Sequence, residues 1–257
     1  MSAPSLLAVY AHPDDESLWS GGALARHAAA GGRTAVVTTT WAEDTARAAE
    51  LAEALRILGA GTPRMLGYAD ARAQESAPGR MRFCDAPLDE TVERLVAHIR
   101  EFRPRVVVTH DAYGGLTGHP DHLHTHRVTL IAVHAAGLDQ LYRQAGKPWQ
   151  PSALYLATHP HSAVPSLADH LTRPGRLTEM TMRSVPDSHI TATLDVRPWL
   201  EQKTAAVLAH RTEVQRGAAP GLLANLPRAT RDEFLGTEYY IRHSLRPPTA
   251  HQTELTT

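Results

Sequence analysis

Two short segments rich in histidine and aspartate, each placed after an apolar run, most constrain what this chain can fold into. The first, residues 11–16, reads Ala-His-Pro-Asp-Asp-Glu and follows the apolar run 6–10. The second, residues 118–122, reads Gly-His-Pro-Asp-His and follows the Val-rich run 105–109 through a Gly-rich loop. Short apolar runs that end in such polar segments predict buried strands. We therefore expect both segments at the carboxyl ends of strands, where ligands bind in open α/β sheets.

The residue types in these segments predict a metal site with a catalytic water. A hydrolytic zinc ion takes about three nitrogen or oxygen ligands from protein and keeps a position open for water, whose pKa falls towards about 7. His12, Asp15 and His122 would supply such a set. Asp14 is then free to act as general base, and His119 to polarise the scissile carbonyl or protonate the leaving amine. Ferrous iron would also fit, since ligand type restricts metal identity only loosely.

A single His-Pro-Asp segment would more often be an ordinary turn in which the Asp side chain bonds nearby backbone. The chain has 16 His, and we interpret His-Pro-His at residues 159–161 as a loop of this kind. Two such segments, each after an apolar strand and each with several metal-capable side chains, favour the metal site instead. His124 and His126 we expect to line the pocket or the helix surface, because three protein ligands already satisfy an open catalytic site.

Together the two segments resemble the signature pair of the PIG-L/LmbE-like zinc-dependent de-N-acetylases, which remove acetyl groups from N-acetylglucosaminyl conjugates. The similarity continues through residues 47–59, 66–70 and 203–212, and covers about residues 5–245. By this resemblance His12, Asp15 and His122 are zinc ligands, Asp14 is the general base and His119 stabilises the oxyanion.

The resemblance also implies roles for residues outside the two segments. Arg47 and Asp70 would contact the sugar, and Asp121 would orient a neighbouring His, as carboxylates behind metal ligands do. His210 either points into the pocket or satisfies a carboxylate in the core. Tyr113, in the Gly-rich loop before the second segment, is a further candidate for contact with the substrate.

Hydrophobic periodicity predicts a chain of alternating strands and helices. We expect strands at 6–10, 34–40, 64–67, 106–109, 153–158 and 189–196, the last at a sheet edge, and helices at 17–31, 45–58, 88–102, 121–136 and 198–210. This order predicts a Rossmann-like three-layer α/β sandwich with a mostly parallel sheet and right-handed crossovers. The loop 71–86 and the segment 159–190 are expected to form the pocket wall.

Composition and missing motifs narrow the function. With 257 residues, 42% of them hydrophobic, we expect one catalytic domain over 1–257, with its core at about 5–245 and a flexible tail at 246–257. The net charge of −1, without a basic stripe, gives no reason to expect a nucleic-acid partner. No signal peptide or membrane-spanning run is recognised, so we expect a cytoplasmic location. The sequence lacks a Gly-x-Gly-x-x-Gly motif, which disfavours nucleotide binding, and a Gly-x-Ser-x-Gly motif, which disfavours serine hydrolysis.

The sequence therefore predicts a zinc-dependent hydrolase that removes the N-acetyl group from an N-acetylglucosamine-type conjugate, either a small glycoside or a natural-product intermediate. One alternative is an amidase that cleaves a larger amide of a glucosaminyl conjugate. Another is a sugar-binding protein without catalysis, whose hallmark would be a broken ligand set, whereas the set here is complete. The expected partner is a small amino-sugar conjugate, and a homo-oligomer is left open.

Overall fold

The strands form one seven-stranded sheet in the order β3-β2-β1-β4-β5-β7-β6. The computed structural model describes residues 3–171 and 182–246. The strands are β1 (Leu6–Tyr10), β2 (Thr34–Thr40), β3 (Pro63–Tyr68), β4 (Val106–His110), β5 (Ala153–Thr158), β6 (Ala192–Asp195) and β7 (Thr237–Ser244). β1 to β5 pair in parallel, while β7 is antiparallel to both β5 and β6. The predicted α/β fold with a mostly parallel sheet is confirmed.

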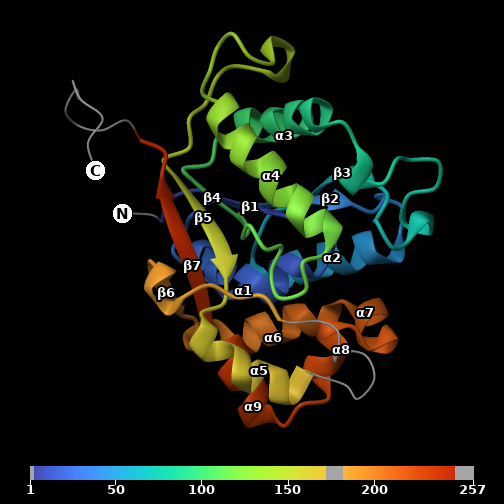
Figure 1. Ribbon diagram of the computed structural model, residues 1–257, viewed down its shortest axis with the longest axis vertical. Helices are drawn as coiled ribbons and strands as arrows, with labels where there is room; N and C mark the ends of the chain where they lie inside the picture. The colour runs from blue at the N-terminus through green and yellow to red at the C-terminus, as the bar shows by residue number, and fades with distance from the viewer. Residues whose placement is uncertain (1–2, 172–181, 247–257) are drawn as a thin grey trace.

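Helices cover both faces of the sheet (Figure 1). They are α1 (Asp15–Ala29), α2 (Ala46–Leu58), α3 (Leu88–Phe102), α4 (Pro120–Ala135), α5 (Val164–Leu171), α6 (Leu200–Ala209), α7 (Arg211–Arg216), α8 (Ala219–Ala224) and α9 (Arg228–Leu235). One apolar core lies between the sheet and α3 with α4, and a second lies between the sheet and α1, α2 and α6. The short helices α5 and α7 to α9 gather beyond α1 and α6 in Figure 1. No helix in the described part of the chain is long and apolar enough to cross a membrane.

The sequence-based elements and the structure differ mainly in the last third of the chain. The prediction omitted β7 and the short helices α5, α7, α8 and α9. The expected edge strand is β6, which is shorter than predicted and lies at the edge of the sheet. The loop 71–86 contains two 3-10 turns, Gln74–Ser76 and Phe83–Asp85. The predicted flexible tail falls on residues 247–257, outside the described residues.

α1 follows the first polar segment directly, so its position fixes that of the segment. Gly22 lets the helix pack closely, because an added Cβ there would lie only 2.6 Å from Cγ1 of Val196. The backbone N–H groups of Gly22 and Ala23 donate to the carboxylate of Glu238, at 2.8 and 3.0 Å. Glu238 also pairs with the buried Lys203 at 2.8 Å. The helix is thus held against the last strand and α6 by both packing and charge.

We predict that Gly22→Ala lowers the free energy of unfolding by about 2 kcal/mol, because the new methyl group overlaps Val196 and the core must shift. Gly21→Ala, one residue away, is the matched control, since its Cβ would meet Lys203 Cγ at 3.0 Å and Leu58 Cδ2 at 3.7 Å, which are less severe contacts. Urea denaturation of both variants measures the difference. Equal stabilities would contradict the close contact at Gly22.

Candidate active site

A cavity of about 330 Å³ opens at the carboxyl edge of the sheet, where the sequence predicts the site. The loops after β1, β3, β4 and β5 reach it, and the helices α5, α7, α8 and α9 close it from the other side. The sequence-predicted residues that line it are His12, Asp14, Asp15, Arg47, Asp70, His119 and His122. The two segments predicted to converge therefore do so.

Three candidate ligand atoms meet in a nearly equilateral triangle. His12 Nδ1 lies 3.1 Å from His122 Nε2, and each lies 3.3 Å from Asp15 Oδ2. Tetrahedral zinc with bonds of about 2.0–2.1 Å places its ligand atoms about 3.3 Å apart. The spacing of these three atoms therefore fits one metal ion.

Carboxylate and carbonyl groups orient the two imidazoles for binding a metal. His122 Nδ1 lies 3.2 Å from the carbonyl oxygen of Gly114, which fixes its proton there and leaves Nε2 as a lone-pair donor. His12 Nε2 lies 3.3 Å from both Asp121 and Asp70. Asp121 is in turn held by the backbone N–H groups of Ala71 at 2.8 Å and Cys84 at 3.2 Å. The predicted orienting role of Asp121 agrees with this arrangement.

Asp14 is held beside the triangle in a conformation that is unusual for a non-glycine residue. Its φ is 132°, in a region that typically costs about 1–3 kcal/mol and occurs at functional sites. Its Oδ1 lies 3.3 Å from the guanidinium of Arg47. Burial raises the pKa of Asp14 to about 7, although the charge of Arg47 opposes this rise. A buried carboxyl with a pKa near neutrality suits a general base.

Arg47 itself is almost fully buried, at 2% exposed, and is fixed from several sides. Besides Asp14, it pairs with Glu213 at 3.3 Å, donates to the carbonyl oxygen of Pro13 and lies over the ring of Trp41 at 4.5 Å. Its guanidinium is therefore preorganised on the cavity wall.

His119 caps the amino terminus of α4, with its Nδ1 accepting from the backbone N–H of Asp121 at 3.3 Å. This contact assigns the ring proton to Nε2. Burial, reinforced by the charges of His12 and His122, lowers the pKa of His119 to about 3. A neutral imidazole with its N–H towards the cavity can donate a hydrogen bond to a carbonyl oxygen on which negative charge develops.

The charge balance of the site supports a bound cation. Around the triangle lie four buried carboxylates, Asp14, Asp15, Asp70 and Asp121. Burial lowers the pKa of His12, but Asp121 and Asp15 outweigh it and raise the value to about 10. These carboxylates thus stabilise a positive charge at His12, and either a proton or a bound metal ion can supply that charge. Groups of His and Asp atoms close enough to hold a metal occur here among the described residues.

His110 belongs to the site but was not predicted. It is the last residue of β4, is fully buried and stacks on the His122 ring at 3.9 Å. Its Nε2 lies 3.5 Å from Asp15 Oδ2. Its position in the sequence could have indicated this role, because the last residue of the strand before the second segment lies at the same edge of the sheet as that segment. Glu213 and Arg216 also line the cavity without having been predicted to do so, whereas His159 belongs to the segment 159–190 that was expected to form the pocket wall.

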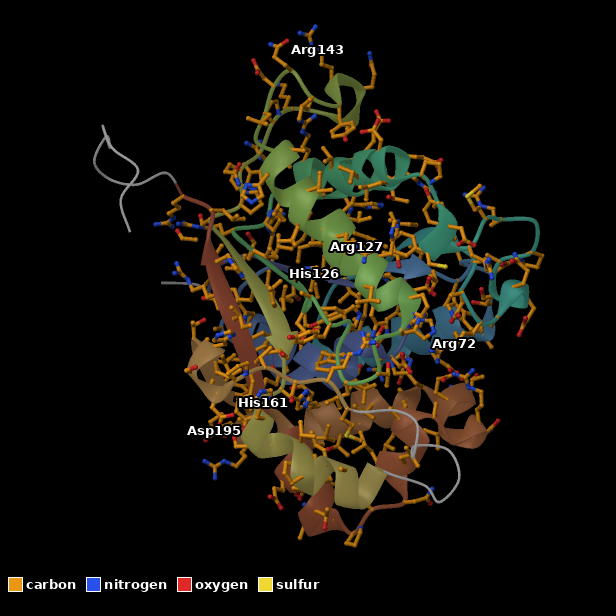
Figure 2. The ribbon with its side chains drawn as sticks, viewed as in Figure 1. Arg72, His126, Arg127, Arg143, His161 and Asp195 are labelled. Carbon is orange, nitrogen blue, oxygen red and sulfur yellow. The ribbon has the colours of Figure 1, made fainter. Side chains whose placement is uncertain are left out.

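Some predicted contacts are absent from the cavity. Tyr113 is 47% exposed and lies outside the lining, because its loop turns away to let Asp111 accept from the N–H groups of Tyr113 and Gly115. His124 and His126, expected at the pocket or helix surface, are buried in the protein instead. His126, labelled on α4 in Figure 2, donates to the carbonyl oxygen of His110 at 2.9 Å, and so supports β4.

His210 takes the second of its two expected roles. It is fully buried outside the cavity lining, with Nε2 2.8 Å from Glu16 Oε1. Burial lowers the pKa of His210, but the Glu16 carboxylate outweighs it and raises the value. Burial raises the pKa of Glu16, but His210 and hydrogen bonds from Ser17 and the backbone of Asp14 outweigh it and lower the value. The pair therefore supports the turn that presents Asp14.

We predict that zinc stabilises metal-stripped protein, and that His122→Ala removes this effect. A ligand at 100 times its Kd adds about 2.7 kcal/mol, or about 5–10 °C in Tm for a chain of this size. His134→Ala, an exposed histidine on the same helix, is the matched control and should keep the shift. An unchanged shift in His122→Ala, measured by thermal denaturation, would exclude His122 as a ligand.

We predict that Glu16→Gln destabilises the protein by about 3 kcal/mol at pH 5.5, because it leaves a buried imidazolium without its carboxylate. A raised His210 pKa gives stability that is full below about 6.5 and lost as pH rises through the folded value. A lowered Glu16 pKa gives stability that is full above about 4.5 and lost on acidification. The deficit should therefore shrink towards pH 9, as measured by urea denaturation, and a deficit independent of pH would contradict an ionic pair.

Comparisons with known proteins agree with the fold and identify the family. Residues 7–133 match the PIG-L family, described as GlcNAc-PI de-N-acetylase. A 1D-myo-inositol 2-acetamido-2-deoxy-alpha-D-glucopyranoside deacetylase of Rhodococcus jostii (strain RHA1) is 38% identical over 96% of this chain and 89% of its own. The conserved protein TT1542 from Thermus thermophilus is 27% identical, with a TM-score of 0.61 and coverage of 99% of both chains. The N,N'-diacetylchitobiose deacetylase from Pyrococcus horikoshii, 18% identical, shares the fold with a TM-score of 0.61, over 93% of this chain and 82% of that one.

Fold, site and relatives together define an N-deacetylase, an enzyme that hydrolyses a linear amide. The chain belongs to the PIG-L family of de-N-acetylases. This confirms the family that the two His-Asp segments predicted.

Proposed function

We propose that this protein is a zinc-dependent hydrolase that removes the N-acetyl group of an N-acetylglucosamine-type conjugate. The observation that carries the proposal is the triangle of ligand atoms, 3.1 to 3.3 Å apart, beside the buried carboxyl of Asp14. His12, Asp15 and His122 would hold the metal. The match to the 38% identical deacetylase of an N-acetylglucosaminyl inositol supports the amino-sugar substrate.

The protein's own residues account for the proton transfers. When bound, zinc would polarise the acetyl carbonyl and lower the pKa of a coordinated water towards about 7. Asp14 accepts a proton from the attacking water as the new carbon–oxygen bond forms, and Arg47 holds its carboxylate in place. His119 donates a hydrogen bond from Nε2 to the carbonyl oxygen as it gains negative charge. The proton held by Asp14 then passes to the nitrogen as the carbon–nitrogen bond breaks, which yields acetate and a free amine.

The sugar would lie against polar groups that line the cavity. Arg47, Asp70 and His159 are three of these lining residues. The Nδ1 atom of His159 is buried without a hydrogen-bond partner among the described residues. Sugar hydroxyls require such fixed donors and acceptors, so these side chains are the proposed sugar contacts.

Asp14→Asn is predicted to lower kcat for acetate release from methyl N-acetylglucosaminide at least about 100-fold, because an amide cannot accept the proton. Zinc should still bind with unchanged stoichiometry, which metal analysis of the purified protein measures. Asp44→Asn, at an exposed aspartate outside the cavity, is the control.

Wild-type protein that binds zinc but releases no acetate from any N-acetylglucosaminide would overturn the proposed function. Cleavage of larger N-acyl groups in that case would favour the amidase alternative. Sugar binding without turnover of any amide would favour the binding protein. Retained turnover in Asp14→Asn would remove only the assigned base.

A further inference from the structure

The cavity has two chemically different walls. The loops at the strand ends contribute most of its ionisable and histidine side chains. The opposite wall comes from α5, from the start of α8 and from α9, and we call it the apolar wall. It consists of Leu167, Ala218, Ala219, Leu223, Phe234 and Leu235.

Half of the apolar wall is built into the protein interior, while Ala219 is exposed at its rim. Leu223 and Leu235 belong to a core cluster with Val207 of α6, against which Phe234 packs. Leu167, Leu223 and Leu235 are 6%, 5% and 4% exposed. Because these side chains are fixed by packing, the wall is preformed and needs no rearrangement to accept a ligand.

Three polar side chains of the cavity lining lie beside the apolar wall: Glu213, Arg216, whose side chain is 60% exposed, and His159, which lines a second hollow together with Leu167 and Phe234. Glu213 is 2% exposed as a side chain and pairs with both Arg47 and Arg216. The remaining polar lining lies on the side of the strand ends, where Figure 2 shows Arg72 in the loop after β3. The side chains of the apolar wall itself are all Leu, Ala or Phe, so a polyol seated directly on them would lose hydration without gaining hydrogen bonds from them, which is unfavourable.

An amino sugar with its acetyl group near Asp14 must direct its remaining substituent along the cavity. Since the strand-end wall holds the amide and the sugar hydroxyls, the substituent meets the apolar wall. The cavity is small for a ligand site, whose usual range is about 300–1,000 Å³, so sugar and substituent together fill it.

We propose that this enzyme acts on N-acetylglucosaminides whose aglycone is apolar, an alkyl or aryl group seated against Leu167, Ala219 and Leu223. The inference rests on the proposed deacetylase function and names its substrate class. The name of the 38% identical relative specifies an inositol aglycone, so the inositol conjugate is the competing substrate in the test.

The test is a series of N-acetylglucosaminides with methyl, butyl and hexyl aglycones, together with the inositol conjugate, assayed by acetate release. Transfer of one methylene out of water corresponds to about a fourfold gain at full burial. With partial burial we expect kcat/KM to rise about two- to threefold per methylene, and hexyl to exceed inositol. A second series, with a methyl aglycone and N-acyl groups from acetyl to hexanoyl, should show falling kcat/KM.

Two wall variants and one control locate the effect. Ala219→Asn introduces an amide at an exposed position of the wall, and Leu167→Ala removes apolar area. Both should leave the methyl glycoside within about twofold and lower kcat/KM for the hexyl glycoside about fivefold. Leu138→Ala, an equally apolar residue that is 53% exposed outside the cavity, should change neither.

Direct binding tests the wall without turnover. Calorimetry with hexyl glucosaminide, the amine product, should give a negative heat-capacity change that Ala219→Asn reduces. A flat aglycone series with active methyl glycoside, a preference for inositol, or a gain that follows the N-acyl chain would overturn the apolar aglycone and leave the hydrolase in place. Wild-type protein inactive on every glycoside would overturn the proposed function itself.

Discussion

The parallel pairing of β1 with β4 is the constraint on which the site depends. Leu6 pairs with Val106 and Val9 with Thr109, so the two strands end side by side. Consequently the segments that follow them, which carry His12 and His122 at a separation of 110 residues, bring two imidazole nitrogens within 3.1 Å. The triangle takes atoms from both segments, which are separated along the chain by α2 and α3, so only the pairing of the two strands brings these atoms together.

The burial of charged side chains is the second constraint on the site. The sheet edge concentrates carboxylates in a region with little water, where each raises the proton affinity of its neighbours. The guanidinium of Arg47 forms ion pairs with two of these carboxylates, Asp14 and Glu213. A metal ion at the triangle would balance the negative charge of the others. The unusual backbone of Asp14 survives because the surrounding contacts of Glu16 and Arg47 hold it on both sides.

The convergence of His12, Asp15 and His122, with Asp14 beside them, was predictable because its signal is local. A strand followed by closely spaced His and Asp residues contains both the geometry and the chemistry, as at Asp14 and Asp15. Arg47 and Asp70 could be placed only through the family resemblance. Glu213 reaches the cavity from α7, a helix that is too short to show periodicity, and β7 lies between β5 and β6, out of the order of the chain. Whether Tyr113 reaches the cavity was left open by the sequence, because proximity in sequence says little about the direction of a Gly-rich loop, and the structure places it 47% exposed outside the lining.

Asp121 connects the loop 71–86 with His12 of the first polar segment, two parts of the molecule that are distant in sequence. One of its oxygens accepts from Ala71 and contacts His12, and the other accepts from Cys84. Both ends of the loop 71–86 are thus tethered to the carboxylate that aims a ligand. The entropy cost of ordering this loop would therefore be part of the cost of binding a metal at the triangle, because the loop holds the carboxylate that orients the His12 imidazole. Substitutions in the loop would therefore change the affinity of the site for a metal ion without contacting that ion.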